Sequence, residues 1–451
     1  MNPLLGGDLF ADVFSTEEMR NLFTEAAFID RFLEVEAALA RAEARAGIVP
    51  EDAANTIAAN ATLDSLDRDR VATNVEEMGL FSMSIIEAWK VDLGAAGEYL
   101  HWGASTQDIS DTVMVLLLRD AHDQLLRDLV SIRDQLAELA DEYRDTPMVG
   151  RTQYAHGPPT TFGLKTATWI DGIDRHICRL DRVADRLFVV QLAGASGTLS
   201  GLEDNGGQIL EWFAEELGLG VPRVGWTATR DRFAEILNVF AMIAGTLSRL
   251  AREILFLNRP EIGELREVVP DDELGSSTNP HKQNPVFSQV NVGLARLIRS
   301  HADAMNESLE PLGDRDRSAW YVEFALLPAS CCYLARLLEN TRLNLDELTV
   351  CPGQMEQNLR DAGPMILSEA VMIALGKHVG RQTAHSIIRE NAMEAVKTDS
   401  DFRRCLLEDD RVTEHLSEDD IESLTTATDY TGMAEQFVTS VLNSLDDTQD
   451  V

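Results

Sequence analysis

Hydrophobic side chains recur every three or four positions along most of the chain, with charged side chains between them. This spacing places apolar residues on one face of an α-helix, and it is clearest over residues 17–47. Alternating apolar and polar positions, which are typical of β-strands, are scarce. The pattern therefore predicts an all-α protein. Further long helices are expected over residues 109–143, 160–190, 230–258, 285–309 and 319–345.

The predicted helices differ in length along the chain. Those in the middle are roughly 30 residues long, which is typical of a helix bundle. Shorter helices are expected before and after them. These lengths predict a helical N-terminal domain over 1–108, a central helix-bundle domain over 109–350 and a helical C-terminal domain over 351–451.

The apolar faces of the central helices are wide. Residues 230–258 are apolar on more than one face, which predicts a helix buried among others. A single chain would leave such faces in water. We therefore expect copies of the chain to associate through the bundle.

The chain is strongly acidic. Its 39 Lys and Arg residues face 76 Asp and Glu residues, which gives a formal net charge of -37 at pH 7. The charge is spread along the sequence, and this predicts a solvated surface suited to a very salty cytoplasm. An acidic interaction surface is the alternative. Nucleic acids and anionic membranes are disfavoured as partners, because both need a basic face.

Signals for export, membrane insertion and metal binding are weak. The first residues lack the basic and apolar regions of a signal peptide. The most apolar stretches look too short, or too rich in Gly and Ser, to span a bilayer. The five cysteines show no CxxC spacing, so neither a disulfide framework nor a zinc site is expected. We expect a cytoplasmic protein without a bound metal.

One loop between long predicted helices holds several chemically useful side chains. Residues 275–285 read GSSTNPHKQNP and contain two adjacent serines, a lysine and an asparagine. Lysine is rare in this chain, yet Lys282 is retained here. We infer that Lys282 has a function, and an ordinary surface turn is the alternative.

Two more polar stretches precede predicted helices. Residues 101–108 read HWGASTQD, and Ser105, Thr106 or Asp108 can cap the helix that follows. The free N–H groups of the same helix start can instead bind a carboxylate. Residues 150–165 contain one histidine, His156.

An arginine lies between two aspartates at residues 314–316. The planar guanidinium of Arg315 can bind a carboxylate through two parallel hydrogen bonds. A surface ion pair with Asp314 or Asp316 is the alternative.

These motifs resemble the fumarase/aspartase superfamily. The loop matches the family pattern GSSxMPxKxN, with Asn279 in place of the usual Met and Gln283 in place of an Arg. The HWGASTQD stretch resembles the branch of 3-carboxy-cis,cis-muconate cycloisomerases. Adenylosuccinate lyases and fumarases have a histidine where this chain has Gln153, whereas the cycloisomerase branch has one at the place of His156.

The resemblance implies a homotetramer in which three chains build each active site. It implies addition or elimination beta to a carboxylate, on a small di- or tricarboxylate and without a cofactor. Ser276 would be the base, Lys282 would stabilise its alkoxide, and His156 would be the acid or a proton relay. The residues that the resemblance places against substrate are His101, Ser105, Thr106, Gln107, Thr152, Gln153, Ser277, Lys282, Asn284, Arg230 and Arg315.

Two alternatives to a cycloisomerase stay open. One is adenylosuccinate lyase or another C–N or C–O lyase of the same superfamily. The other is a non-catalytic scaffold of this fold, which the departures at Gln153, Asn279 and Gln283 would support.

Overall fold

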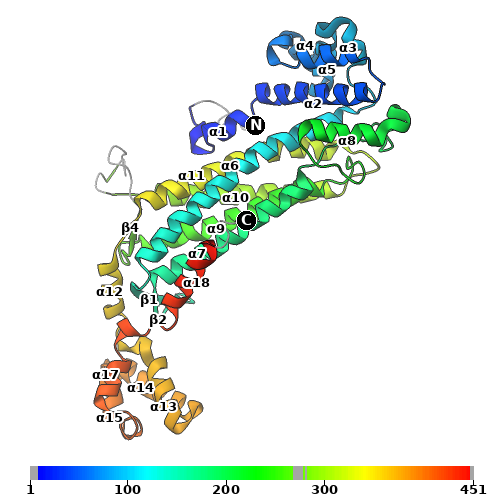
Figure 1. The fold of residues 1–451 in the computed structure, drawn as a ribbon. Helices are drawn as coiled ribbons and strands as arrows, with labels where there is room; N and C mark the ends of the chain where they lie inside the picture. Colours follow the sequence, from blue (N-terminus) through cyan, green and yellow to red (C-terminus); the bar gives the residue numbers. More distant parts are fainter. Residues whose placement is uncertain (1–8, 268–277, 280–281, 447–451) are drawn as a thin grey trace. The chain divides into compact units, whose positions relative to one another are not determined.

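The computed structural model describes residues 9–267, 278–279 and 282–446, and helices dominate it (Figure 1). The α-helices are α1 (Glu17–Leu22), α2 (Glu25–Arg45), α3 (Glu51–Ala59), α4 (Arg68–Met78), α5 (Phe81–Leu93), α6 (Thr106–Glu142), α7 (Phe162–Leu187), α8 (Gly206–Leu217), α9 (Asp231–Leu257), α10 (Val286–Asn306), α11 (Arg317–Glu347), α12 (Pro352–Asp361), α13 (Ser368–Val379), α14 (Arg381–Thr398), α15 (Phe402–Glu408), α16 (Asp410–Thr413), α17 (Glu418–Leu424) and α18 (Ala434–Asp446). The all-α prediction is confirmed.

Four short strands form two separate antiparallel pairs. They are β1 (Pro147–Thr152) with β2 (Ala155–Thr161), and β3 (Leu265–Arg266) with β4 (Thr349–Val350). The periodicity did not predict the β1–β2 hairpin, because β2 contains Gly157, Pro158 and Pro159, which are uncommon in strands.

The chain divides into two compact units, each made of three sequence segments. Unit 1 comprises Met1–Val130, Arg175–Ser248 and Val290–Asn340, and unit 2 comprises Ser131–Asp174, Arg249–Gln289 and Thr341–Val451. The dividing points fall inside α6, α7, α9, α10 and α11. The predicted three domains follow the sequence order instead, and that organisation stays a prediction.

The long helices form the predicted central bundle. In unit 1, hydrogen bonds cross from α6 to α7 (His122 Nε2 to the Leu180 carbonyl, 3.0 Å) and from α7 to α9 (His176 Nε2 to Thr246 Oγ1, 2.8 Å). In unit 2, Lys165 of α7 donates to a carboxylate of α9 at 2.7 Å. Leucines and isoleucines of α6, α9 and α11 are almost fully buried along these contacts.

Two of the described helices, α9 and α11, are long and apolar enough to cross a membrane by length and composition. The expectation that no stretch meets this test was therefore too strict. Within the structure, 61% of the most apolar window of α9 is buried and 44% of that of α11. Both helices belong to the bundle, and the buried core helix of a soluble protein has the same composition.

The N-terminal part of unit 1 packs around α2. This helix contacts α3 and α8 and buries Phe32 and Leu39 in a core that also contains Trp89 of α5 (Figure 1). The single helix expected over 17–47 is in fact two, because the Thr24 side chain accepts the Ala27 N–H at 3.1 Å and starts α2 anew.

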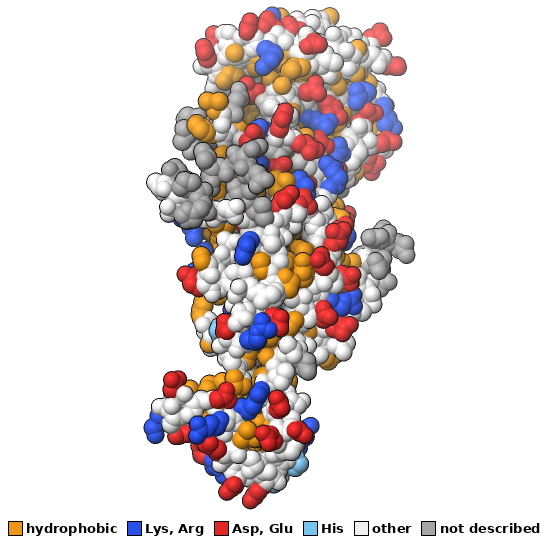
Figure 2. All heavy atoms as spheres, turned by 90° about the vertical axis from the view of Figure 1, so that its left-hand side faces the viewer, with side chains coloured by type: hydrophobic (Ala, Val, Ile, Leu, Met, Phe, Trp, Pro, Cys, Tyr) orange, Lys and Arg blue, Asp and Glu red, His pale blue; other side chains and the backbone are white. Residues whose placement is uncertain are grey.

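The surface has mixed charge. On the face shown in Figure 2, acidic side chains are spread among basic and uncharged ones. Many of the basic groups are paired, as in the exposed pair of Arg404 with Glu408 on α15. Such exposed pairs contribute little to stability, so the acidic excess mainly affects solvation.

A buried charge cluster joins three helices of unit 1. Arg230, at the start of α9, is 2% exposed and forms two hydrogen bonds to Asp111 of α6, at 2.7 and 2.9 Å. Its Nε donates to Glu323 of α11 at 2.7 Å. The guanidinium also lies over the Trp226 and Phe233 rings. Two carboxylates therefore share one buried cation.

We expect Arg230→Ala to lower the free energy of unfolding by about 3–5 kcal/mol, because it leaves two buried carboxylates without their cation. Denaturant unfolding followed by circular dichroism measures this. Arg404→Ala, which removes an exposed arginine from a pair within one helix, should change stability by less than about 0.5 kcal/mol. Equal effects of the two substitutions would contradict a supporting role for Arg230.

Candidate active site

The start of α6 is closed by a reciprocal cap. The Ser105 hydroxyl accepts the Asp108 N–H at 3.3 Å, and the Asp108 carboxylate accepts the Ser105 N–H at 2.8 Å. The expectation that one of the hydroxyl or carboxyl groups here caps the helix is confirmed. A direct contact of Ser105 with substrate stays a prediction.

Asp108 also holds a loop against this helix start. Its carboxylate accepts the N–H groups of Ala193 and Gly194 at 3.1 and 2.9 Å, and the Gln191 side-chain amide at 3.2 Å. Burial raises the pKa of Asp108, although these hydrogen bonds act in the opposite direction. The carboxylate is therefore structural, and it fixes the first turn of α6 in place.

The arginine predicted to bind a carboxylate lies beside that turn. Arg315 Nε donates to Gln107 Oε1 at 3.0 Å, and its Nη2 donates to Thr106 Oγ1 at 3.3 Å. The neighbouring Asp316 accepts from Ser318 instead, at 2.7 Å. The structure therefore brings Arg315 next to Thr106 and Gln107, which lie more than 200 positions earlier in the sequence.

The Gln107 amide completes this arrangement. Its Nε2 donates to the Thr227 carbonyl at 3.1 Å and lies 3.3 Å from an oxygen of Asp111. Asp111 in turn binds Arg230, and the N–H groups of the Arg230 guanidinium donate to the carboxylates of Asp111 and Glu323. Arg230 thus supports the helices under the site, and its predicted contact with substrate finds no support in this geometry.

His101 lies in the same segment. Its Nδ1 is 2.7 Å from Glu36 Oε1 of α2, and its backbone has a φ of 61°, in the left-handed region. Burial lowers the pKa of His101, but the charge and hydrogen bond of Glu36 outweigh it, so the pKa is raised overall. Asp108 raises this pKa further and Arg315 lowers it.

Together these groups make this part of unit 1 favourable for a negatively charged ligand. A guanidinium, a histidine with a raised pKa and the N–H groups of the first turn of α6 all favour a negatively charged ligand. The Thr106 hydroxyl adds a neutral group.

The second signature stretch forms the β1–β2 hairpin of unit 2. Thr152 pairs with Ala155, so Gln153 and Tyr154 form a two-residue turn, with φ values of 50° and 64°. Asn and Gly are the residues that usually occupy such a turn, because both positions need a positive φ. Gln153 and the fully exposed Tyr154 therefore hold a strained conformation at the tip.

His156 lies just after this turn, opposite Arg151 in the strand register. Both line a cavity of about 310 Å³, together with Tyr154, Asn358 and Asp361. Arg151 itself is held by Glu264 through hydrogen bonds of 2.9 and 2.6 Å. The imidazole of His156 is exposed, and its role as an acid or relay stays a prediction.

The signature loop is described only in part. The predicted base Ser276 and its neighbour Ser277 lie outside the described residues. The Lys282 side chain is exposed, and the backbone N–H of Lys282 donates to the Asn279 carbonyl at 2.9 Å. Asn284 is half-buried.

Glu267, which precedes this loop in sequence, binds the helix that follows the loop. Its carboxylate accepts the Phe287 N–H at 2.7 Å, and the Ser288 hydroxyl and Asn344 amide at 2.5 and 3.0 Å. A carboxylate at this place is favourable because Phe287 and Ser288 belong to the first turn of α10. The contact holds the chain before the loop against the helix that follows it.

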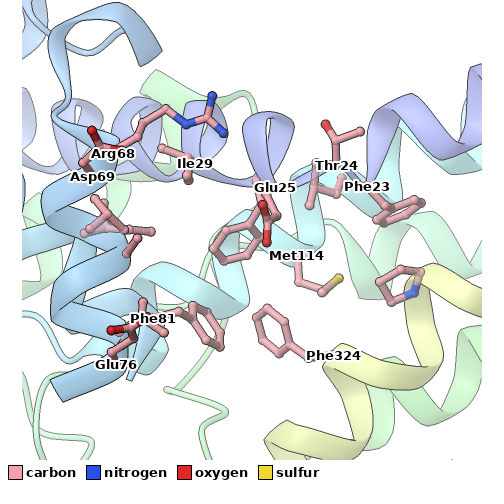
Figure 3. A pocket seen from close by; sticks show the side chains of 17 residues that line it. Phe23, Thr24, Glu25, Ile29, Arg68, Asp69, Glu76, Phe81, Met114 and Phe324 are labelled. Carbon is pink, nitrogen blue, oxygen red and sulfur yellow. The ribbon is translucent and has the colours of Figure 1, made fainter. Parts of the chain in front are cut away.

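A separate cavity of about 990 Å³ lies in unit 1 (Figure 3). The rings of Phe81 and Phe324 and the side chain of Met114 line it, with Arg68 and Asp69 at one side. Of the residues predicted from the sequence to touch substrate, those that the structure describes do not line this cavity.

Three buried carboxylates near the site were not predicted from the sequence. Glu36, Glu43 and Asp111 are buried, and each lies on the apolar face of its helix. Their position within the hydrophobic stripe is the signal that could have identified them, because a charge on a core-facing position needs a partner or a proton.

The chain matches known protein families over most of its length. Residues 13–299 match a family described as "Lyase", and residues 364–441 match one described as "Adenylosuccinate lyase C-terminus". The N-acetyl-S-(2-succino)cysteine lyase of Dickeya dadantii is 36% identical over 98% of this chain and 97% of its own. The 3-carboxy-cis,cis-muconate cycloisomerase of Pseudomonas aeruginosa is 34% identical, with coverages of 98% and 97%.

Solved structures share the fold. A fumarate lyase from Mesorhizobium sp. BNC1 superposes with a TM-score of 0.89 at 37% identity, covering 95% of this chain and 98% of its own.

Glu43 should make stability depend on pH. Burial, followed by the charge of Glu36, raises the pKa of Glu43 from 4.5 to about 9. Between these values the folded chain holds one proton that the unfolded chain has lost. The contribution of protonated Glu43 to the free energy of unfolding is complete below pH 4.5. It falls by about 1 kcal/mol per pH unit above this value and is lost as the pH rises through 9.

In Glu43→Gln this titration is absent. We expect its stability relative to the parent protein to increase steadily from pH 5 to pH 9, as measured by denaturant unfolding at fixed salt. Glu34→Gln, on the same helix but half-exposed, is the control and should show no such trend. A stability difference between Glu43→Gln and the parent protein that stays constant with pH would show that Glu43 is ionised in the folded protein.

Proposed function

The chain belongs to the fumarase/aspartase superfamily of lyases. From this premise we propose that it transfers a proton at the carbon next to a carboxylate, while a bond at the following carbon, beta to the carboxylate, forms or breaks. The contact of Arg315 with Thr106 and Gln107 is the observation on which this proposal rests. It unites two signature segments around a place where a carboxylate can bind.

The substrate that we propose first is 3-carboxy-cis,cis-muconate. The HWGASTQD segment, His156 and the lack of a histidine at position 153 all follow the cycloisomerase branch. The relative from Pseudomonas aeruginosa with this activity matches almost the full chain. The proposed reaction is the closing of a lactone ring or its reverse.

The proposed mechanism uses a serine as base. In the lactone-forming direction, a carboxylate oxygen of the substrate adds to one carbon of a double bond, and the electrons move into a neighbouring carboxylate as an aci-acid. The Ser276 hydroxyl then gives its proton to the adjacent carbon. In reverse, the Ser276 alkoxide takes that proton, so the alkoxide must be stabilised by nearby donors such as Lys282.

Arg315 and Lys282 have separate tasks in this mechanism. Negative charge develops on the carboxylate that becomes the aci-acid, and Lys282 with Asn284 would stabilise it. Arg315 would hold a second carboxylate against the start of α6. The substituted position Gln283 is exposed and removes one positive charge from the loop.

Cleavage of a 2-substituted succinate is the second candidate. The relative from Dickeya dadantii, named for its action on N-acetyl-S-(2-succino)cysteine, is 36% identical over 98% of the chain. Elimination from such a compound breaks the bond beta to a carboxylate and needs the same proton transfer. Adenylosuccinate is the third substrate to test, because the C-terminal residues match an adenylosuccinate lyase family.

We further propose a homotetramer in a salt-rich cytoplasm, with each active site built from several chains. The long helices of the described structure leave large apolar side chains such as Met242 and Leu297 partly exposed. Pairing of helices between copies would cover them.

Ultraviolet absorbance distinguishes the candidate substrates. We expect purified protein in concentrated potassium chloride to remove the diene absorbance of 3-carboxy-cis,cis-muconate. N-acetyl-S-(2-succino)cysteine and adenylosuccinate are assayed beside it. If only N-acetyl-S-(2-succino)cysteine or only adenylosuccinate is turned over, that compound replaces 3-carboxy-cis,cis-muconate as the proposed substrate. If a folded tetramer turns over none of the three compounds, the result counts against the proposed chemistry.

Whichever substrate is turned over, we expect Ser276→Ala to lower kcat by at least about a thousandfold, since the proton loses its acceptor. Ser300→Ala, at an exposed position of α10, is the control and should retain activity. Full activity in Ser276→Ala would remove the serine from the mechanism.

Arg315→Gln should lower kcat/KM about 10- to 100-fold, because a charge-assisted bond to a substrate carboxylate is lost. Arg317→Gln, two positions away and exposed, is the matched control. Equal losses in both would exclude a specific role for Arg315.

The same variants test the shared site. If Ser276 and Arg315 of one site come from different chains, mixing the Ser276→Ala and Arg315→Gln proteins under conditions of subunit exchange should give more activity than the two separate proteins together. Recovery that fails despite mixed tetramers, detected by mass spectrometry, would place both residues on one chain.

A further inference from the structure

Two buried glutamates of α2 lie next to the candidate site, outside the proposed mechanism. Glu36 and Glu43 are seven positions apart, so both point to the same face of the helix. They are 1% and 0% exposed. Among the described residues, Glu36 Oε2 and both carboxyl oxygens of Glu43 have no hydrogen-bond partner. Only Glu36 Oε1 has one, the ring of His101 at 2.7 Å.

Burial limits the charge that this cluster can hold. An ionised carboxylate in an apolar core is unfavourable unless a cation balances it, and two carboxylates beside one cation cannot both ionise at low energy. The favourable state has one negative charge on Glu36, one positive charge on His101 and a proton on Glu43. The raised pKa values of Glu43 and His101 agree with this state.

The surrounding elements supply few other charges. Asp108 of α6 and Arg315, before α11, act on His101 with opposite signs. The side chains that α3, α5 and α8 bury in this core are uncharged. At the rim, Glu215 and Glu216 of α8 are paired with Arg45 and Arg41. Within the described part of the chain, Glu36 is therefore the one carboxylate that hydrogen-bonds to the His101 ring.

The backbone of His101 adds a second argument. A residue other than glycine with a φ of 61° pays a conformational penalty, which persists only where other contacts fix the residue. The 2.7 Å contact with Glu36 provides such a fixed point. It also occupies Nδ1, which leaves Nε2–H as the ring's other donor.

We propose that Glu36 is a positioning residue, which holds His101 as an imidazolium so that the ring can bind a substrate carboxylate beside Arg315, while Glu43 stays protonated. The substrate part of this inference rests on the proposed function. The charge state of His101 does not, because it belongs to the free protein.

The charge state is tested first, without substrate. Histidine rings labelled with ¹³C are titrated by NMR in the intact protein, and the His101 signal is identified by its loss in His101→Gln. We expect His101 to titrate above the ordinary histidine value of about 6.5. Titration below that value overturns the proposal, even if no Glu36 variant folds.

The variants then separate the two glutamates. Glu36→Gln keeps a hydrogen-bond acceptor but removes the charge, so the pKa of His101 should fall by about one unit or more. Glu43→Gln should shift it by only a few tenths, because a protonated carboxyl and an amide are both neutral. A shift as large in Glu43→Gln as in Glu36→Gln would show that Glu43 is ionised and overturn its assignment.

Kinetics tests the link to substrate. With the substrate that the protein turns over, Glu36→Gln should raise KM about tenfold with little change in kcat, and move the alkaline limb of the kcat/KM profile to lower pH. Glu34→Gln, half-exposed on the same helix, should change neither. An unchanged KM and pH profile in Glu36→Gln overturns the positioning role. Absence of all turnover together with a raised His101 pKa instead counts against the proposed function.

Discussion

The buried contact of Arg230 with Asp111 and Glu323 is the interaction on which the candidate site depends. It joins the start of α9 to the second turns of α6 and α11. Asp111 is one helical turn from Gln107, and Arg315 lies just before α11. A change in the spacing of these helices would therefore separate Arg315 from Gln107, although neither residue belongs to the buried cluster.

In each of the two units, buried carboxylates hold positive groups in place. Glu36 binds His101, Glu264 binds Arg151, and Asp111 with Glu323 binds Arg230. Each contact fixes the orientation of a positive group. Among the described residues, the hydrogen bonds of Arg315 go to the neutral side chains of Thr106 and Gln107, so its charge stays available to a ligand.

The other two signature stretches are organised by their own local contacts. The β1–β2 turn holds Gln153 and Tyr154 at positive φ, next to His156. Glu267 joins the chain before the signature loop to the first turn of α10. Each of these contacts therefore orders described residues next to a signature stretch.

The sequence by itself determined the helical fold and the chemical class of the site. Helical periodicity and caps depend on residues within about four positions of one another, so α6, α9 and α11 and the Ser105 cap could be predicted. The signature loop is a contiguous motif, and it pointed to the family. Only the tertiary structure decided the partners of the charged groups. Arg230 and Arg315 look alike in sequence, each beside an aspartate, yet one is buried and the other contacts the start of α6. Glu36 looked like any glutamate of an amphipathic helix. Their partners lie 65 to 208 positions away, and such pairings are set by how helices pack, which no local pattern encodes.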